Sequence, residues 1–221
     1  MRVGANLVPE LDGGEIVRRA FGSAIGASTL VAAHPAPAHH AMGGEMPTTL
    51  AQGLISGLAH PVIGPDHLAF VVGVGILSAF VPRGWILPAM FLVAGAFGTA
   101  LHLGGFGIPA AETLVAISVL LMAAAIWFRG RKPIALFAAL CGLGGLVHGY
   151  ALAESIIGSE PTPFLAYLLG LLAVQLAISL LVRQAVLWIA SERPTLARPT
   201  ALAASMAMLV VGAALLPLWG S

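Results

Sequence analysis

The chain has 221 residues, of which 59% are hydrophobic and 9% are charged, and its formal net charge is +1. Soluble domains carry about 25% charged residues, so this composition, with a mean hydropathy of +0.98, excludes an ordinary soluble domain and indicates a protein that lies in a lipid bilayer. The single cysteine, Cys141, excludes an intrachain disulfide and a cysteine metal cage. It stands in an apolar run and is expected to be buried. No basic stripe points to nucleic acid.

The first 38 residues are expected to be a signal peptide or leader. Arg18 and Arg19 precede an apolar run at residues 21–33, which as a helix rises only about 20 Å and is too short for a hydrocarbon core of ~30 Å. This order is typical of a secretory signal, and Arg-Arg-x-Phe also fits a twin-arginine signal. An uncleaved helix packed on the bundle is the alternative. Residues 39–47 would form an extracytoplasmic N-terminal segment.

Residues 48–221 are expected to form an all-α membrane domain, a polytopic helical bundle of six transmembrane helices. Residues 48–81 are too many for one straight crossing, and Pro61, Gly64 and Pro65 interrupt the helical hydrogen bonding there. We interpret this stretch as a short half-helix, a break, and a main helix over about residues 66–81. The first helical segment is thus broken or re-entrant. The other spans are expected at residues 85–105, 108–128, 133–153, 164–190 and 201–219.

The basic residues orient these spans. Beyond the leader they lie in or beside the connections between spans 1 and 2, 3 and 4, and 5 and 6. By the positive-inside rule these three connections face the cytoplasm, so both mature termini are expected to be extracytoplasmic. The basic residues are Arg83, Arg129, Arg131, Lys132, Arg183, Arg193 and Arg198.

Seven histidines and carboxylates stand in or near the expected spans, with no lysine or arginine among them. A charged group at the centre of a span costs at least ~2.5–3.5 kcal/mol, so such residues are rare unless a function requires them. Imidazole suits nickel, cobalt, copper and zinc. In the orientation above all of them fall in the outer half of the membrane, which predicts one metal site there. The residues are His60, Asp66, His67, His102, Glu112, His148 and Glu154.

The break in the first segment is expected to form the core of this site. Membranes tolerate open backbone only around a protein-lined or wet cavity, and discontinuous helices build ion sites in transporters. Simpler structural roles stay open for individual residues. These roles are a turn residue for His60, partners of helix N-termini for Asp66 and Glu112, a hydrogen-bonded interior histidine for His67, an interfacial histidine for His102, and a rim residue for Glu154.

The segment HPVIGPDH at residues 60–67, followed by LAFVVGVG at 68–75, resembles the signature of the HupE/UreJ family of bacterial nickel and cobalt permeases. The stretch ETLVAISVLL at 112–121 is similar to the third span of that family, and LVHGYA at 146–151 to its fourth. The resemblance covers about residues 45–220. Where the family often has a second histidine after His-Gly-x-Ala, this chain has Leu152.

The resemblance implies a leader peptide, six spans, the bacterial inner (cytoplasmic) membrane and a role in metal supply to hydrogenase or urease. It assigns His60, Asp66 and His67 to the metal path, with Glu112, His148 and Glu154 as contributors. We therefore expect a permease and not an enzyme. Nickel or cobalt is expected as the transported ion, with no separate cofactor and no nucleotide motif for ATP coupling. The expected partners are the metal ion and the lipid bilayer, and the oligomeric state is not predicted.

Two other functions stay open. An intramembrane metal-dependent hydrolase would hold zinc on three histidines and use Asp66 or Glu112 as its base, helped by a serine such as Ser56. The His-Glu-x-x-His signal of many such enzymes is missing from the sequence. A metal sensor would bind the ion without moving it. Metal accumulation separates the three, since only the permease gives flux.

Overall fold

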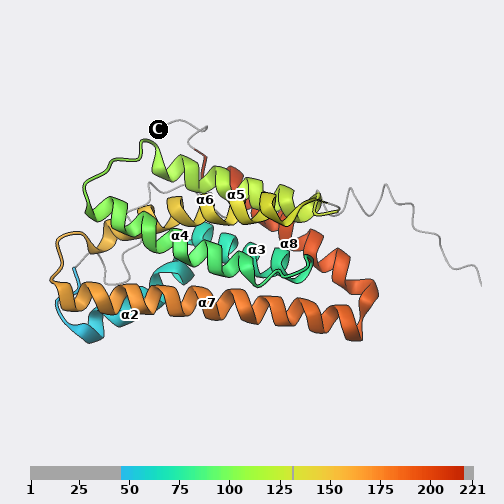
Figure 1. The fold of residues 1–221 in the computed structure, drawn as a ribbon, viewed down its shortest axis with the longest axis horizontal. Coiled ribbons are helices and arrows are strands. Elements are labelled where there is room, and N and C mark those ends of the chain that lie inside the picture. The colour runs from blue at the N-terminus through green and yellow to red at the C-terminus, as the bar shows by residue number, and fades with distance from the viewer. Residues whose placement is uncertain (1–45, 131, 217–221) are drawn as a thin grey trace, which may run out of the picture. The chain divides into compact units, whose positions relative to one another are not determined.

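The computed structural model describes residues 46–130 and 132–216. These residues belong to one compact unit, Pro37–Ser221. They form helices joined by short connections, with no strand in this part of the chain (Figure 1). The expected leader, residues 1–38, lies outside the described residues. Residues 39–45 of the expected extracytoplasmic segment lie outside them as well.

The first membrane segment is broken, as the sequence predicts. Helices α2 (Leu50–Ile63) and α3 (Pro65–Ala79) meet at Gly64 with a bend of 80°. The break comes after Pro61, which lies buried inside α2. Gly64 is extended, with φ −77° and ψ 110°, and this conformation ends α2. Pro65 then starts α3, because its fixed φ suits the first position of a helix.

The remaining helices follow the expected spans, with shifted ends. They are α4 (Ile86–Leu103), α5 (Ala111–Trp127), α6 (Ile134–Ala153), the short 3₁₀ helix η1 (Glu154–Ile156), α7 (Pro161–Glu192) and α8 (Pro194–Ala214). The largest difference is at α8, which begins at residue 194 and not at the predicted residue 201. Its first helical position is again a proline, and proline is favoured there.

These helices form a polytopic membrane bundle. Four of them, α4, α6 together with η1, α7 and α8, are long and apolar enough to cross a membrane, and α2 and α3 pass the same test together as a bent pair. Helix α5 is apolar but shorter, with 17 residues. The expected number of six crossings therefore depends on counting α5 as a span, and it stays a prediction.

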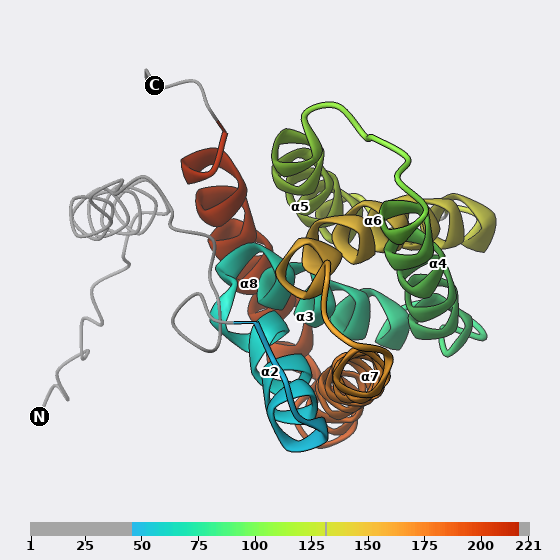
Figure 2. The same ribbon diagram turned by 90° about the vertical axis from the view of Figure 1, so that its left-hand side faces the viewer.

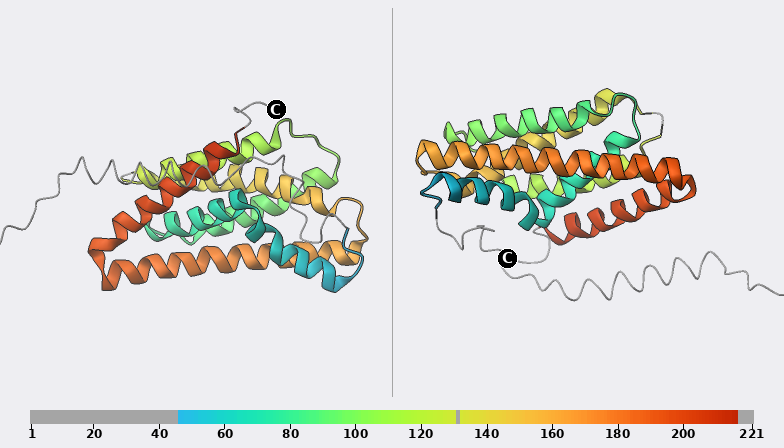
Figure 3. Two further views of the ribbon diagram at one scale, coloured as in Figure 1. Left: turned by 180° about the vertical axis from the view of Figure 1, so that it is seen from behind. Right: turned by 90° about the horizontal axis from the view of Figure 1, so that it is seen from below.

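The basic connections share one end of the bundle. The α3–α4, α5–α6 and α7–α8 connections lie together at the right-hand end of Figure 1, and the views from behind and below in Figure 3 agree. The start of α2 and the α4–α5 and α6–α7 connections lie at the opposite end. This alternation is what the positive-inside rule requires. The side of the membrane that each end faces stays a prediction.

Glycines bring two pairs of helices into backbone contact. Helix α4 packs most extensively on α6, and α2 on α7 (Figure 2). A Cβ atom on Gly149 of α6 would stand 2.0 Å from the carbonyl oxygen of Gly95, and one on Gly57 of α2 would stand 2.1 Å from that of Tyr167. Real side chains do not approach backbone so closely. Small residues at such contacts are the usual means of close helix packing in membranes.

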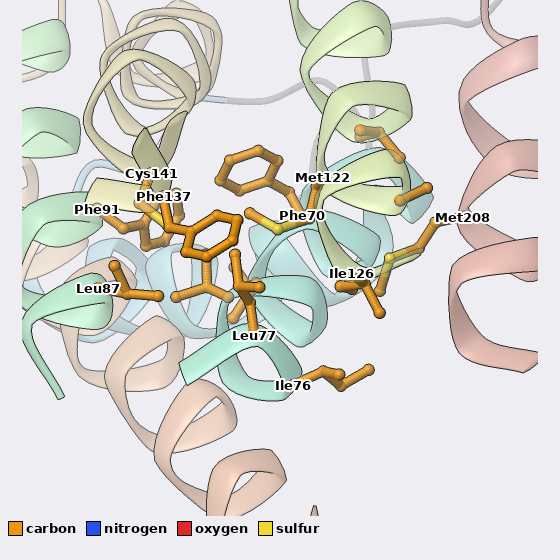
Figure 4. Packing of buried hydrophobic residues seen from close by; sticks show 14 of the residues in the cluster. Phe70, Ile76, Leu77, Leu87, Phe91, Met122, Ile126, Phe137, Cys141 and Met208 are labelled. Atoms are coloured by element: carbon orange, nitrogen blue, oxygen red, sulfur yellow. The ribbon is translucent and has the colours of Figure 1, made fainter. Parts of the chain in front are cut away.

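A cluster of apolar side chains packs between α3, α4, α5 and α6. Phe70, Leu77, Phe91 and Met122 belong to it and are buried (Figure 4). Cys141 is fully buried in the same cluster, which confirms the expectation for this residue. Phe70 also packs against His148, with ring centroids 4.5 Å apart. The apolar cluster therefore borders the candidate site directly.

Candidate functional site

Three of the expected histidines meet around the break in the first segment. His60 stands in the last turn of α2, His67 in the first turn of α3, and His148 in α6. All three are buried, with exposed fractions of 8%, 8% and 1%. The Nδ1 atoms of His67 and His148 are 2.7 Å apart, and the ring centroids of His60 and His67 are 6.3 Å apart. Segments far apart in the sequence thus bring three imidazoles together.

A chain of hydrogen bonds assigns the protons of two of these rings. The Ser118 hydroxyl donates to the carbonyl oxygen of Val115 at 2.7 Å. A hydroxyl has one hydrogen, so in the tautomer that keeps this bond Ser118 Oγ accepts at its other contact, from His148 Nε2 at 2.9 Å. His148 Nδ1 then carries the lone pair of that neutral ring, and His67 Nδ1–H donates to it. The assignment follows from the network, as histidine tautomers usually must.

This assignment gives His67 and His148 different roles. Neutral His67 carries its lone pair on Nε2, the ring nitrogen that stands 3.9 Å from Asp66 Oδ1. Asp66 Oδ1 also accepts from the backbone N–H of His67 at 2.8 Å, in the first turn of α3, where a carboxylate is favoured. A nitrogen donor and an oxygen donor thus lie side by side. In this tautomer His148 accepts from His67 and orients its ring, and a direct part of His148 in metal binding stays a prediction.

His60 is held by two hydroxyl groups. Tyr167, fully buried on α7, donates its hydroxyl hydrogen to the carbonyl of Leu152 at 2.6 Å. Its oxygen, 3.3 Å from His60 Nδ1, therefore accepts from that ring. Ser155 Oγ stands 3.1 Å from the same nitrogen. With its proton on Nδ1, His60 carries its lone pair on Nε2, as His67 does.

The backbone at Gly64 lies so close to this pair of donors that little space is left for a side chain. A Cβ atom here would stand 2.7 Å from Cδ2 of His67 and 3.1 Å from Asp66 Oδ1. Any larger residue would have to displace the imidazole or the carboxylate. The glycine of the motif is therefore required by close approach at this position.

The other three predicted residues occupy different surroundings. His102 Nδ1 donates to the carbonyl of Tyr150 at 2.7 Å, and the two rings stack with centroids 4.0 Å apart. Glu112 lies in the first turn of α5 and Glu154 at the start of η1, and both are exposed. The places of Glu112 and Glu154 are compatible with the helix-terminus and rim roles that stay open for them. A part in metal binding stays a prediction for all three.

The donors that the structure describes do not form a closed cage. Among the described residues, no three His, Cys, Asp or Glu side chains stand close enough to hold a metal ion together. The arrangement is an open pair, His67 and Asp66, with His60 farther away across the break. Conduction requires binding that is weak enough for an ion to leave. An open donor set is compatible with that requirement.

The comparisons with known proteins agree with the motif. Residues 27–215 match the family described as HupE / UreJ protein. The chain belongs to the HupE/UreJ family. Protein HupE of Rhizobium leguminosarum bv. viciae is 31% identical over 102 residues, which are 45% of this chain and 53% of that protein. The match thus spans about half the length of this relative. No solved structure matches the chain.

In this HupE/UreJ member the sequence reasoning missed the residues that hold the histidines. Ser118, Ser155 and Tyr167 each contact a histidine of the candidate site. Ionisable side chains inside spans are the costly ones, and serine and tyrosine hydroxyls do not stand out in this way. Ser118 could have been noticed as a polar residue within an apolar span. The contact of Tyr167 with His60 depends on the packing of α2 against α7, and that of Ser155 depends on the approach of η1 to α2.

Proposed function

We propose that this HupE/UreJ member is a permease for the uptake of divalent transition-metal ions, with nickel or cobalt as the expected ions. The observation that carries the proposal is the pair formed by His67 Nε2 and the Asp66 carboxylate at the break, 3.9 Å apart. Imidazole nitrogen suits nickel, cobalt and zinc, and the carboxylate offsets the charge of the ion. Discontinuous helices carry the ion sites of many transporters. The preference for nickel or cobalt rests on the family resemblance of the motif.

In this proposal the ion enters from the outer side and exchanges part of its water for His67 and Asp66. His60, across the break, offers the next nitrogen. The rings must be neutral to bind a metal ion, and their contacts to His148, Tyr167 and Ser155 are made through Nδ1, which leaves Nε2 as the nitrogen for the ion. A membrane potential that is negative inside would favour entry of a divalent ion by about 4.6 kcal/mol per 100 mV.

Flux through the purified chain tests the proposal. Proteoliposomes with an inside-negative potential should accumulate radiolabelled nickel or cobalt above empty liposomes, and each of the two ions should compete with the other. Accumulation should fall when the potential is collapsed. Binding without accumulation would favour a sensor, and the absence of both would remove the metal hypothesis.

The contact between Ser118 and His148 is the observation that bears on the hydrolase alternative. A serine nucleophile must give its proton to the neighbouring base. Here the Ser118 hydroxyl donates to Val115, so the serine accepts from His148 instead. Both side chains are buried, with exposed fractions of 6% and 1%. Ser56, the serine considered above, is buried on α2. This contact therefore gives no support to a serine nucleophile, and among the described residues no three His, Cys, Asp or Glu side chains form the zinc site that the hydrolase would need.

Ser118→Ala should raise the KM for metal uptake by about 10–100-fold, the usual cost of losing a group that orients a metal ligand. The change removes the acceptor of His148 Nε2–H, which fixes the tautomer of His67. Ser118→Thr keeps the oxygen and should restore most of the affinity. The measurement is KM and maximal rate of uptake for each variant.

Ser205→Ala is the matched control. Ser205 is also a buried serine, on α8, and donates to the carbonyl of Leu202. If Ser118→Ala and Ser205→Ala gave the same KM, Ser118 would have no special part in the site.

A further inference from the structure

A basic pocket lies at the end of the bundle that carries the basic connections. It has a volume of about 330 Å³ and is lined by Trp127, Phe128, Arg129, Gly130 and Arg198. Arg129 directly follows the C-terminal end of α5, and Arg198 stands near the start of α8. Two helices thus bring two guanidinium groups to one pocket.

The side chain of Arg129 is held by a backbone carbonyl and an aromatic ring at the same end of the bundle. Its Nη1 donates to the carbonyl of Ile126, and its guanidinium lies 4.1 Å from the centroid of the Phe80 ring. Burial and the positive charge of Arg198 lower the pKa of Arg129. An arginine has five N–H donors in a rigid fork. One bond to a carbonyl therefore leaves enough N–H groups to bind two oxygens of an anion at once.

Among the described residues, no carboxylate compensates these two charges. Within residues 46–130 and 132–216, neither Arg129 nor Arg198 forms an ion pair with Asp or Glu. The three connections and the helix ends beside them carry six basic residues, Arg83, Arg129, Arg131, Lys132, Arg193 and Arg198, against one carboxylate, Glu192, which is a surplus of five positive charges. An anion from outside the chain would therefore be attracted to this pocket.

An apolar groove continues from the same pocket. It has a volume of about 310 Å³ and shares Trp127 and Phe128 with the basic pocket; its other lining residues are Ala123, Ala124, Met206 and Leu209. Ala123 and Ala124 lie one turn back along α5. Met206 lies about 12 Å beyond Arg198 along α8, at a rise of ~1.5 Å per residue. The groove therefore leads from the two arginines toward the middle of the bundle.

We propose that this site binds an anionic phospholipid, with its phosphate on Arg129 and Arg198 and one acyl chain in the groove between α5 and α8. Basic pockets between membrane helices on the cytoplasmic side bind anionic head groups. A soluble phosphate would use only the polar pocket, whereas a lipid uses both parts. Trp127 and Phe128, where the two parts meet, are aromatic residues of the kind found at the membrane interface. The proposal requires a membrane bundle but does not depend on which ion is transported.

Native mass spectrometry of the full-length purified chain tests this site with phosphatidylglycerol as the probe. Each basic residue contributes about 1 kcal/mol to binding an anionic membrane lipid, or about fivefold in affinity. The double variant Arg129→Gln/Arg198→Gln should therefore bind phosphatidylglycerol about 25-fold more weakly than the wild type. Arg193→Gln is the matched control, because Arg193 is exposed at the same end and does not line the pocket. It should bind as the wild type does.

Three results would overturn the proposal. The first is equal binding of phosphatidylcholine, whose head group has no net charge. The second is equal weakening by Arg193→Gln, which would indicate a diffuse surface charge. The third is displacement of the lipid by inorganic phosphate at equal concentration, which would assign the pocket to a soluble anion. If the double variant failed to fold, Arg198→Gln alone, at an exposed residue, should still weaken binding about fivefold.

Discussion

His67→Ala should lower the initial rate of nickel or cobalt uptake by about 100-fold or more, because residues that merely orient a metal ligand already change affinity by about 10–100-fold. His67 supplies the nitrogen next to Asp66, and its Nδ1 contacts His148 at 2.7 Å. The substitution removes both the donor and the link from the break to α6. The measurement is the initial rate of radiolabelled metal uptake at equal amounts of protein in the membrane.

His102→Ala is the matched control for this prediction. It also removes one imidazole from the same half of the bundle, but His102 stacks on Tyr150 and donates to its carbonyl. Uptake by His102→Ala should therefore stay close to the wild-type rate. Normal uptake by His67→Ala, or an equal loss in both variants, would contradict the assignment of the site to the break.

Gly149→Ala should destabilise the folded bundle by about 3 kcal/mol, the upper part of the usual range for overpacking. The new Cβ atom would stand 2.0 Å from the carbonyl oxygen of Gly95, so α4 and α6 would have to move apart. A backbone atom cannot swing away as the end of a flexible side chain can. Gly149 directly follows His148 in the chain, so uptake should fall together with stability. The measurement is the thermal unfolding midpoint of the purified chain in detergent.

Gly142→Ala provides the matched control on the same helix. Its Cβ atom would meet only the Met90 methyl group, at 3.7 Å, and alanine is favoured over glycine in a helix by ~1 kcal/mol. This variant should unfold at the wild-type temperature or slightly above it. If Gly149→Ala were as stable as Gly142→Ala, the close packing of α4 on α6 would not be needed.

The break in the first segment was predictable because its cause is local. Gly64 and Pro65 stand next to each other, and each limits helical hydrogen bonding without help from distant residues. The position of the break within the segment was less predictable. Pro61 also breaks helices in many proteins, yet here it is accommodated inside α2. Spans could be predicted for the same local reason, since their length and apolar character are read directly from the chain.

The separate roles of the histidines could not be predicted from the sequence. His67 and His148 are 81 positions apart, and their contact depends on how α3 and α6 pack. His102 looked equivalent to them by its position in a span. Its stacking on Tyr150 depends on the glycine contacts between α4 and α6. The sequence identified the polar groups, and the packing of the helices decided which of them meet.

The most direct test of the metal site at the break is nickel-edge X-ray absorption of the purified, nickel-loaded chain. We predict imidazole scattering in the wild type that is weakened in His60→Ala, lost or nearly lost in His67→Ala, and unchanged in His102→Ala. The same imidazole scattering in the wild type and in His67→Ala would contradict the account.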